Sequence, residues 1–398
     1  MKNVLIGQSG GPSCVINATL YGVIKSFKNH DVKIYGMING IEGFIKGKYE
    51  ELNELTDYEL ELLKTTPAMY LGSCRYKLSS DFNDKDYAII YNELNKLNIG
   101  YFIYVGGNDS MDTANKMNSY LRSKNSDILV IGLPKTIDND LYGLDHSPGY
   151  ASSVRFILDQ VQNISIDAGI YDLKSVTIIE IMGRNAGWLT YASHLAKENE
   201  KDNPLLVYVP EVIFSFDKFL KDVEAAFKIN KNVVVCISEG IKTNDNHLVC
   251  EYDKHLATDP FGHKTLDGAA TILADLVKET FNCKARGVIL NVTQRCNASF
   301  ISKVDLEEAI MFGIKGYEAL LNKKTGIMIG SRRISNDPYR IEYIDVNLND
   351  VVEVERKLDE KFLNDLSSFC KYLRPLISEN VKIPSKNGRS LYIFRKNK

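Results

Sequence analysis

The stretch Pro134-Lys135-Thr136-Ile137-Asp138-Asn139-Asp140 carries more information about fold and function than any other part of the chain. It follows an apolar run at residues 128–133, which is typical of a buried parallel strand that ends in turn residues. Ligands of open α/β sheets bind outside the carboxyl ends of the strands, so this segment is expected at a functional site. In an extended segment residues two apart point the same way, which predicts that Thr136, Asp138 and Asp140 face one pocket.

Two carboxylates and a hydroxyl at the end of a strand suit two kinds of chemistry. They could deprotonate a substrate alcohol, hold Mg²⁺, or do both. The same residues also suit an Asx-rich turn that only satisfies backbone groups. Taken alone, the segment leaves the functional and the structural interpretation open, and other parts of the chain have to decide between them.

Glycine-rich segments follow two other predicted strands. The apolar run at residues 101–105 leads into Gly106-Gly107-Asn108-Asp109-Ser110, and the first strand, at residues 4–6, leads into Gly7-Gln8-Ser9-Gly10-Gly11-Pro12. Glycines between a strand and a helix let backbone amides approach an anion, and the helix dipole favours its negative charge. Pro12 is expected in the first turn of the helix that follows. Three strand ends of this kind predict a polyphosphate site at one edge of a sheet.

An ordered set of motifs makes the chain resemble the phosphofructokinase family. The motifs cover roughly the first 300 residues in family order and spacing. They are GGPS…NA at 10–18, GSCR at 72–75, GGNDS at 106–110, PKTIDND at 134–140, MGRNAGW at 182–188, PE at 210–211 and SEG at 238–240. The chain is most similar to the diphosphate-dependent branch, because Asp109 and Lys135 stand where ATP-using relatives carry glycine.

Elementary electrostatics supports this branch independently. A carboxylate at Asp109 would occupy the space and charge that the α-phosphate of ATP needs. Two like charges about 4 Å apart repel by ~4 kcal/mol at an effective dielectric of ~20, on the order of a thousandfold against ATP. Diphosphate has no third phosphate and escapes this repulsion. Lys135 supplies a compact positive charge near the transferred phosphoryl group. Asp109 could also cap the following helix, and the two roles are compatible.

The resemblance implies roles for individual residues. Asp138 is expected to be the base that takes the proton of the attacking hydroxyl, with Lys135 neutralising the phosphoryl group and Asp109 selecting the donor. Diphosphate is expected to contact Gly11, Arg75 and Gly107. The sugar phosphate is expected to contact Thr136, Ile137, Asp138, Asp140, Met182, Gly183, Arg184, Glu239, Arg286 and Arg295. Without the resemblance, Arg286 and Arg295 would be taken for surface ion pairs.

Three positions depart from the family pattern. Asn108 stands where relatives usually carry an acidic metal ligand, and a neutral carbonyl oxygen binds Mg²⁺ more weakly than a carboxylate does. Ser175 and Val292 stand where relatives carry an arginine and a histidine that hold the 6-phosphate of the sugar. The identity of the sugar phosphate therefore stays open, with sedoheptulose 7-phosphate as one alternative.

The resemblance predicts reversible, Mg²⁺-dependent phosphoryl transfer from diphosphate to the 1-hydroxyl of fructose 6-phosphate, a step of glycolysis and gluconeogenesis. An ATP-dependent kinase of the same fold is the first alternative, disfavoured by Asp109 and Lys135. A non-catalytic regulatory subunit is the second, kept open by Asn108 and disfavoured by the intact Asp138 and Lys135. A nicotinamide-dependent oxidoreductase is disfavoured because residues 7–11 do not form the G-x-G-x-x-G fingerprint.

Composition agrees with a globular enzyme. The chain has 398 residues, enough for two or three domains, and 44% of them are hydrophobic. A net charge of −2 gives no reason to expect nucleic acid or an anionic membrane as partner. The seven cysteines form no C-x-x-C pair, which favours reduced thiols in the cytoplasm. His146 is expected to have a structural role only. The resemblance also implies a homodimer or a homotetramer.

The remaining chain alternates stretches typical of strands with stretches typical of helices, which predicts an α/β fold with mostly parallel sheets. Strands are expected at 32–35, 176–181, 205–209, 233–237 and 288–292, and helices at 152–167, 216–227 and 266–280. The resemblance implies two Rossmann-like, three-layer domains. Residues 1–141 with about 299–345 would bind the phosphoryl donor, and 142–298 with about 346–398 the sugar phosphate. The stretch from Lys382 is expected to be a surface tail.

Overall fold

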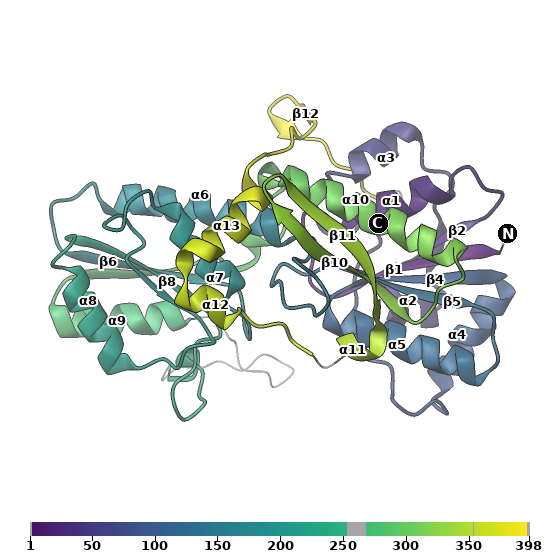
Figure 1. Cartoon of the computed structure of the whole chain (residues 1–398), viewed down its shortest axis with the longest axis horizontal. Coiled ribbons are helices and arrows are strands. Elements are labelled where there is room, and N and C mark those ends of the chain that lie inside the picture. The colour runs from purple at the N-terminus through teal and green to yellow at the C-terminus, as the bar shows by residue number, and fades with distance from the viewer. Residues whose placement is uncertain (1, 253–267, 353, 396–398) are drawn as a thin grey trace. The chain divides into compact units, whose positions relative to one another are not determined.

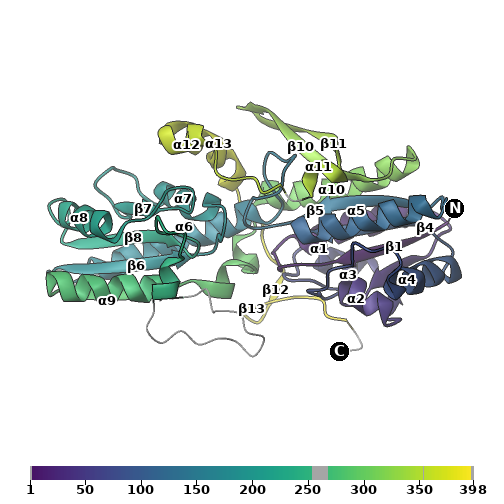
Figure 2. The same cartoon turned by 90° about the horizontal axis from the view of Figure 1, so that it is seen from below.

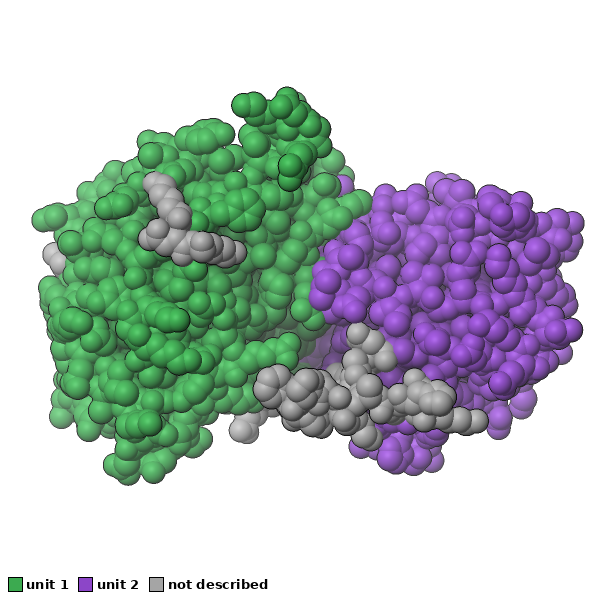
Figure 3. Space-filling view, turned by 180° about the vertical axis from the view of Figure 1, so that it is seen from behind, with its two compact units in different colours: residues 1–152, 295–355, 374–398 green, residues 153–294, 356–373 purple. Residues whose placement is uncertain are grey.

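The chain folds into two compact α/β units. In the computed structural model, which describes residues 2–252, 268–352 and 354–395, unit 1 comprises 1–152, 295–355 and 374–398. Unit 2 comprises 153–294 and 356–373, and Figure 3 draws the two in green and purple. The chain thus passes between the units more than once. None of the helices in these described ranges has the length and apolar content that crossing a bilayer requires.

Unit 1 is built on a seven-stranded sheet in the order β11-β10-β5-β4-β1-β2-β3. The five central strands run parallel, while β3 and β11 at the two edges run antiparallel to their neighbours. The bounds are β1 (Asn3–Gln8), β2 (Ile34–Met37), β3 (Tyr49–Glu51), β4 (Ile99–Gly106), β5 (Leu129–Pro134), β10 (Ile327–Asn336) and β11 (Tyr339–Asn347). The mostly parallel sheet that the periodicity predicted is confirmed.

Helices cover both faces of this sheet. The bounds are α1 (Ile16–Phe27), α2 (Gly40–Ile45), α3 (Asp57–Leu63), α4 (Lys85–Lys96), α5 (Asn108–Ser123), α10 (Lys303–Leu321) and α11 (Leu348–Val351), with a 3₁₀ turn at η4 (Ala298–Phe300). Figure 1 shows α1, α3 and α10 on one face and α4, α5 and α11 on the other. Helix α5 buries Met111, Ala114, Met117 and Leu121, which form its apolar face.

Unit 2 contains a four-stranded, fully parallel sheet in the order β7-β8-β6-β9. The strands are β6 (Ser175–Ile181), β7 (Leu206–Tyr208), β8 (Asn232–Ser238) and β9 (Lys284–Ile289). The helices are α6 (Tyr150–Ala168), α7 (Trp188–Ala192), α8 (Phe216–Ala226), α9 (Ala269–Phe281), α12 (Glu360–Asn364) and α13 (Leu366–Ile377), with 3₁₀ turns η1 (Ser193–Ala196), η2 (Val249–Tyr252) and η3 (Asn291–Gln294). Helices α8 and α9 share one apolar core with β6 and β8.

Several local boundaries differ from the sequence predictions. The last strand of unit 2 is Lys284–Ile289 and not 288–292, because the turn η3 begins at Asn291. The strand predicted at 32–35 begins two residues later, at Ile34. The helix predicted at 266–280 is observed from Ala269, and its first two predicted residues lie outside the described ranges. Periodicity finds these elements but places their ends poorly, as is usual.

The compact units also differ from the predicted domain boundaries. Residues 142–152, 346–355 and 374–398 belong to unit 1, although the prediction placed them in the second domain. Strand β11 runs on to Asn347 along β10, which joins the first part of 346–355 to the large sheet. The final stretch is no loose tail, because Val381, Ile383 and Tyr392 pack on an apolar cluster around Val15 and Ile301.

Candidate active site

The three motifs found in the sequence lie at one edge of the unit 1 sheet. Strands β1, β4 and β5 are parallel neighbours, and their last residues are in register. Gln8 pairs with Val105, and Gly106 pairs with Pro134. The glycine-rich segments that follow β1 and β4 and the acidic segment that follows β5 therefore meet at the same edge. This is the position where open α/β sheets bind their ligands.

Lys135 lies at the centre of this edge. Its side chain is buried, its Nζ donates a hydrogen bond to the carbonyl oxygen of Gly11, and its backbone N–H donates to Gly106 at 2.9 Å. Burial lowers the pKa of the Lys135 ammonium to about 8, although Asp138 and Asp140 favour its charged form. Lys135 follows β5 and contacts both glycine-rich segments, through Gly11 and Gly106. Its ammonium is therefore placed to neutralise an anion bound at this edge.

The backbone around Lys135 leaves room for such an anion. Gly10 has a φ of 83°, in the left-handed region that favours glycine, and a Cβ at Gly11 would meet open space. Gly107 is the N-cap of α5, so the amides of that helix terminus adjoin the loop. Helix α1 begins only at Ile16, which places Pro12 in the preceding loop and not in the first helical turn as predicted. The helix dipole at this site is therefore that of α5.

Asp109 forms an ion pair with Lys77. It is exposed on the first turn of α5, and its Oδ1 lies 2.9 Å from the Nζ of Lys77. Exposed charges are screened by water and salt, so the repulsion of ~4 kcal/mol expected from the sequence is an upper value. Lys77 was not predicted as a site residue, although it stands two positions after the GSCR motif.

The acidic segment forms a turn. Asn139 has a φ of 58°, so the predicted alternation of Thr136, Asp138 and Asp140 along an extended chain is wrong at this residue. The backbone N–H of Asp138 donates to the Thr136 hydroxyl at 3.1 Å, and Asp138 is half-buried. Burial raises the pKa of the Asp140 carboxyl, against the hydrogen bond from Thr136, which lowers it. The turn still brings Asp140 back to Thr136.

The other residues predicted in unit 1 differ in exposure. Ile137 is buried. Arg75 is exposed. The carbonyl oxygen of Arg295 lies 3.5 Å from the Sγ of Cys14, and the positive charge of Arg295 contributes to the low pKa of Lys135. Arg295 therefore lies on the same side of unit 1 as Lys135.

In unit 2 the predicted acceptor residues gather where β6 and β8 end. Ile181 is in register with Ser238, and the backbone N–H of Gly183 donates to Glu239 Oε1 at 3.4 Å. A Cβ at Gly240 would clash with the carbonyl oxygen of Arg184, so the two loops approach closely. The Met182 N–H donates to Gln294 at 3.1 Å, and the Arg184 side chain is exposed.

Arg286 lies apart from these four residues. It is in register with Thr177, which lies four residues before the end of β6 at Ile181. It forms a 3.4 Å ion pair with Asp167. Four residues of strand correspond to roughly 13 Å. Within unit 2 the structure thus brings Met182, Gly183, Arg184 and Glu239 together and leaves Arg286 outside the group.

Comparison with known proteins assigns the chain to a family. The family model named Phosphofructokinase matches residues 3–320, well over half of the chain. The chain belongs to the phosphofructokinase family. This result confirms the resemblance that the ordered motifs indicated.

Several known proteins align with this chain over nearly their full length. The chain is 32% identical to a pyrophosphate–fructose 6-phosphate 1-phosphotransferase of Methylococcus capsulatus, over 98% of this chain and 95% of that protein. It is 30% identical to a sulfofructose kinase of Alkalicoccus urumqiensis, over 94% of this chain and 95% of that one. The crystal structure of a pyrophosphate-dependent phosphofructokinase from Nitrosospira multiformis matches with a TM-score of 0.89 at 32% identity, over 100% of this chain and 97% of that chain. The diphosphate-dependent branch and the phosphofructokinase-like α/β fold predicted from the sequence are confirmed.

Members of the phosphofructokinase family generally need Mg²⁺, and two residues of this chain fit the ion. Asn108 Oδ1 and Asp140 Oδ1 are both buried, and neither has a hydrogen-bond partner among the described residues. The other atoms of the two groups, Asn108 Nδ2 and Asp140 Oδ2, are hydrogen-bonded at 3.1 Å, which holds the side chains together. The described ranges contain no cluster of three His, Cys, Asp or Glu side chains that could hold a metal. Substrate phosphate and water would complete the coordination, which is how Mg²⁺ is usually bound.

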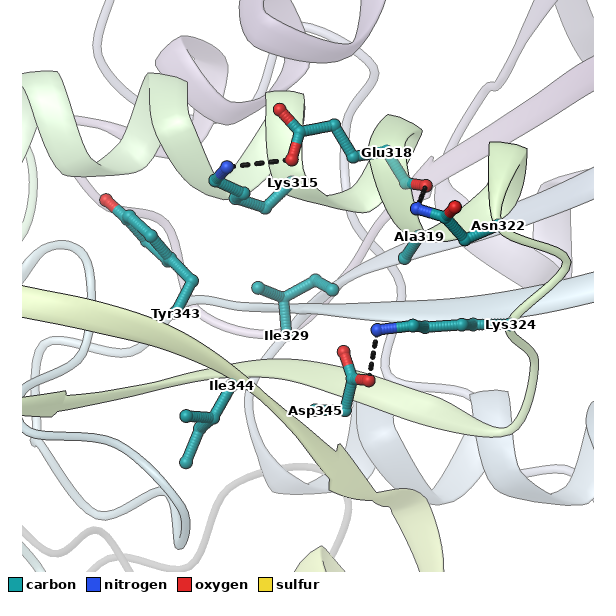
Figure 4. Close-up of a pocket in the computed structure, with 9 residues that line it drawn as sticks. All are labelled: Lys315, Glu318, Ala319, Asn322, Lys324, Ile329, Tyr343, Ile344 and Asp345. Atoms are coloured by element: carbon teal, nitrogen blue, oxygen red, sulfur yellow. Dashed lines mark hydrogen bonds and ion pairs between the residues drawn. The ribbon is translucent and has the colours of Figure 1, made fainter.

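A separate groove in unit 1 lies between α10 and the β10–β11 hairpin. It has a volume of about 320 Å³ and contains none of the predicted site residues. Figure 4 shows Lys315 and Glu318 on one wall, joined by a 2.7 Å ion pair, and Tyr343 and Asp345 on the other. All its charged side chains are at least partly exposed and paired with one another, which is typical of a solvated surface.

Proposed function

We propose that this chain transfers a phosphoryl group reversibly from diphosphate to the 1-hydroxyl of fructose 6-phosphate, with Mg²⁺ as the metal. The position of Lys135 is the observation that carries the proposal. A buried lysine that contacts Gly11 and adjoins Gly107 suits a short anion held deep in the loops. The names of the full-length relatives support the same donor and acceptor.

Each residue of the donor edge has a task in this reaction. Asp138 takes the proton of the acceptor hydroxyl as the hydroxyl oxygen bonds to a phosphorus of diphosphate, and the bridging P–O bond breaks to release phosphate. Lys135 neutralises the charge that spreads over the phosphoryl oxygens, and the amides near Gly11 and Gly107 hold the diphosphate. Thr136 and Asp140 orient Asp138 and the acceptor. Asn108 and Asp140 would hold Mg²⁺, which would supply further neutralisation of phosphate charge.

The acceptor is assigned to the loops of unit 2. Glu239 holds the Gly183 amide and, as a carboxylate, can accept hydroxyl hydrogen bonds from a sugar. Arg184 presents an exposed guanidinium suited to phosphate. Ser175 is buried in β6 and Val292 is exposed, so neither supplies the phosphate contact that relatives have at these positions. One relative is named a sulfofructose kinase, which keeps a different anionic sugar in consideration.

The decisive test is an assay with purified protein, Mg²⁺, and diphosphate or ATP as donor. Fructose 6-phosphate, sedoheptulose 7-phosphate and sulfofructose serve as acceptors in parallel. Diphosphate-dependent formation of fructose 1,6-bisphosphate is expected. Activity with ATP alone would make the chain an ATP-dependent phosphofructokinase. Activity with neither donor would favour a regulatory subunit, and a better acceptor than fructose 6-phosphate would change the assigned substrate.

We also propose that the enzyme is a cytoplasmic homodimer or homotetramer. None of the seven cysteines, all of them in described residues, forms a disulfide bond, which suits a reducing compartment.

The proposed oligomer rests on an exposed sheet edge. Strand β9 is an edge strand, and its Arg286 and Ile289 are exposed. Native proteins usually cover such edges, and a second copy of the chain would do so. Light scattering that gives the mass of a single chain at micromolar concentration would contradict the proposal.

Asn108→Asp should lower the Mg²⁺ concentration needed for half-maximal activity. The change replaces a neutral oxygen next to Asp140 with a carboxylate, which binds Mg²⁺ more strongly. Activity measured against total Mg²⁺ at fixed diphosphate gives the half-saturating concentration. Asn115→Asp, on the exposed side of the same helix, is the matched control. An unchanged requirement would mean that position 108 does not touch the metal.

Asp109→Gly should make ATP-dependent activity appear or rise, with a modest loss of diphosphate activity. The change removes a carboxylate from the donor edge and leaves Lys77, its ion-pair partner, without its carboxylate. Lys77→Met is the informative control, because it keeps the carboxylate and removes its neutralising partner. That variant should exclude ATP at least as well as the unmodified chain. If the unmodified chain already uses ATP as well as diphosphate, Asp109 does not select the donor.

A further inference from the structure

A buried group of charged side chains lies beside the acidic segment in unit 1. We call it the His146 cluster, and it consists of Asp145, His146, Glu308, Arg333 and Tyr339. Its members come from the loop after β5, from α10 and from both strands of the β10–β11 hairpin. Figure 2 shows this hairpin extending beyond β5, consistent with a pairing of β10 with β5 at only Ile327 and Met328.

His146 is held on both sides of its ring. Its Nδ1 lies 3.0 Å from Asp145 Oδ2, and its Nε2 lies 3.1 Å from Glu308 Oε2. Only 1% of the side chain is exposed. Burial lowers the pKa of His146, but the two carboxylates raise it by more, so the pKa is about 10. The ring is therefore a cation over the whole neutral range. A hydrogen bond to Asp145 and an ion pair with Glu308 hold it in place.

The remaining members complete the charge balance. Arg333 Nη2 donates to Asp145 Oδ2 at 2.7 Å, and its guanidinium lies over the ring of Tyr339. The Tyr339 hydroxyl donates to Glu308 Oε1 at 2.6 Å. Two cations thus face two carboxylates. His146 and Arg333 hold the pKa of Asp145 at about 2, despite its burial. Breaking one partner of such a buried set leaves an uncompensated charge.

The cluster is connected directly to the predicted catalytic turn. Ser147 follows His146, and its backbone N–H donates to Asn139 Oδ1 at 2.9 Å. Asn139 is buried and is the left-handed residue between Asp138 and Asp140. Its side chain therefore fixes the direction in which the two carboxylates leave the turn. Any rotation of the 145–147 backbone would move this hydrogen bond.

The same elements hold the loop at two further points. Asp305, on the first turn of α10, accepts the Gly149 N–H at 2.8 Å, and Ser331 on β10 accepts the Asp145 N–H at 3.2 Å. These contacts already attach the loop to unit 1. What His146 adds is an orientation, because its two ring nitrogens lie within 3.1 Å of carboxylates on different elements. Apolar residues of similar volume would stabilise the fold as well, but would not set this orientation.

We propose that His146, clamped between Asp145 and Glu308, is a positioning residue that sets the geometry of Asp138 and Asp140 through the Ser147–Asn139 hydrogen bond. The kinetic part of this inference rests on the proposed phosphoryl transfer. Misplacing a reacting group by about 1 Å can cost 10²-fold in rate, so loss of the clamp should act on kcat.

Glu308→Gln is the first test, because it removes one clamp carboxylate without changing the size of the side chain. We expect kcat with diphosphate and fructose 6-phosphate to fall by about 10- to 100-fold, and both KM values to change by less than about threefold. Glu318→Gln is the matched control, since it makes the same change on the same helix at the exposed groove of Figure 4. The control should behave like the unmodified chain.

A second variant separates positioning from stability. His146→Gln/Glu308→Gln removes one cation and one carboxylate, so the remaining Asp145 and Arg333 stay balanced. Its unfolding midpoint should recover toward that of the unmodified chain, while kcat stays low. A kcat within twofold of the unmodified chain in either folded variant would overturn the proposal. So would activity losses that only match the loss of folded protein.

Amide hydrogen exchange tests the clamp without relying on activity. The amide of Ser147 should be protected in the unmodified chain and in Glu318→Gln, and should exchange faster in Glu308→Gln while the β4 and β5 amides stay protected. Equal protection in all three proteins would contradict the proposal. If the unmodified chain shows the protection pattern but transfers no phosphoryl group, the proposed function fails and the positioning role stands.

Discussion

Replacing Asp138 with asparagine should lower kcat for diphosphate-dependent transfer by at least ~10²-fold, with fold and KM largely unchanged. Asparagine has the same size and keeps the backbone contact to the Thr136 hydroxyl, which lies 3.1 Å from the N–H of residue 138. It cannot accept the proton of the sugar hydroxyl. Steady-state kinetics at saturating Mg²⁺, together with thermal unfolding, measures both effects.

Asp140→Asn is the matched comparison, because it makes the same change two residues away. The Asp140 carboxyl is buried against Asn108, where we place Mg²⁺, so this variant should raise the half-saturating Mg²⁺ concentration. Asp138→Asn should leave that concentration unchanged. If Asp138→Asn keeps most of its rate while Asp140→Asn loses it without a change in Mg²⁺ requirement, Asp140 is the base.

The features that sequence predicted well are local ones. A run of apolar residues that ends in glycine or in an acidic turn needs no distant partner to be recognised. The ends of β4 and β5 fall within one residue of the prediction, whereas β1 runs two residues further, to Gln8. The parallel order of the strands then brings the three segments together. Even here the left-handed Asn139 changed the expected alternation of Thr136, Asp138 and Asp140. The spacing of hydrophobic residues does not reveal the backbone conformation of a single residue.

The features that sequence missed are pairings over long separations. Lys77 and Asp109 lie far apart in sequence, and Asp145 meets Arg333 at a sequence separation of 188 residues. An isolated charged residue looks the same in sequence whether it is solvated or paired in the interior. His146 illustrates this limit, because nothing near it in sequence indicates that Glu308 lies 3.1 Å from its ring.

The C-terminal stretch shows a related limit. Its basic and polar composition predicted a surface tail, yet Ile393 is buried and its N–H donates to the Thr66 hydroxyl at 3.0 Å. A few apolar residues at irregular spacing are enough to dock an extended segment on a preformed core. Such spacing matches neither the helical nor the strand period, so pattern analysis gives no signal.

Replacing Lys135 should have the largest effect on the diphosphate reaction. Lys135→Met removes the buried charge and keeps much of the side-chain volume, and we expect kcat to fall by about 10²- to 10³-fold, as for other preorganised electrostatic groups. The contact to the Gly11 carbonyl is lost with it. Lys116→Met, which removes a lysine paired with Asp112 on α5, is the control and should change kcat little.

The pH dependence tests the same charge without a mutation. Burial lowers the pKa of Lys135 from 10.5 to about 8, so the free enzyme loses this proton as the pH rises through that value. Since the charged form is required, kcat/KM for diphosphate should fall above a pH of about 8.

The stability of the fold should depend on pH for the same reason. In the unfolded chain the Lys135 ammonium keeps its ordinary pKa of 10.5, so the unfolded state binds more protons between pH values of about 8 and 10.5. The free energy of unfolding should therefore rise with pH over this window, by roughly 3 kcal/mol at most. Lys135→Met should remove both effects.

Lys135→Gly in combination with Asp109→Gly tests donor choice at both positions together. The glycine pair restores what ATP-using relatives carry, opens space near Gly10 and Gly11, and removes the exposed carboxylate that pairs with Lys77. ATP-dependent kcat/KM should then exceed that of either single variant, and by more than the product of the single effects, because both positions adjoin one donor site. Kinetics with each donor in all four proteins gives this coupling. If diphosphate remains the better donor in the double variant, the choice of donor is made elsewhere in unit 1, with Arg75 and Lys77 as the next positions to change.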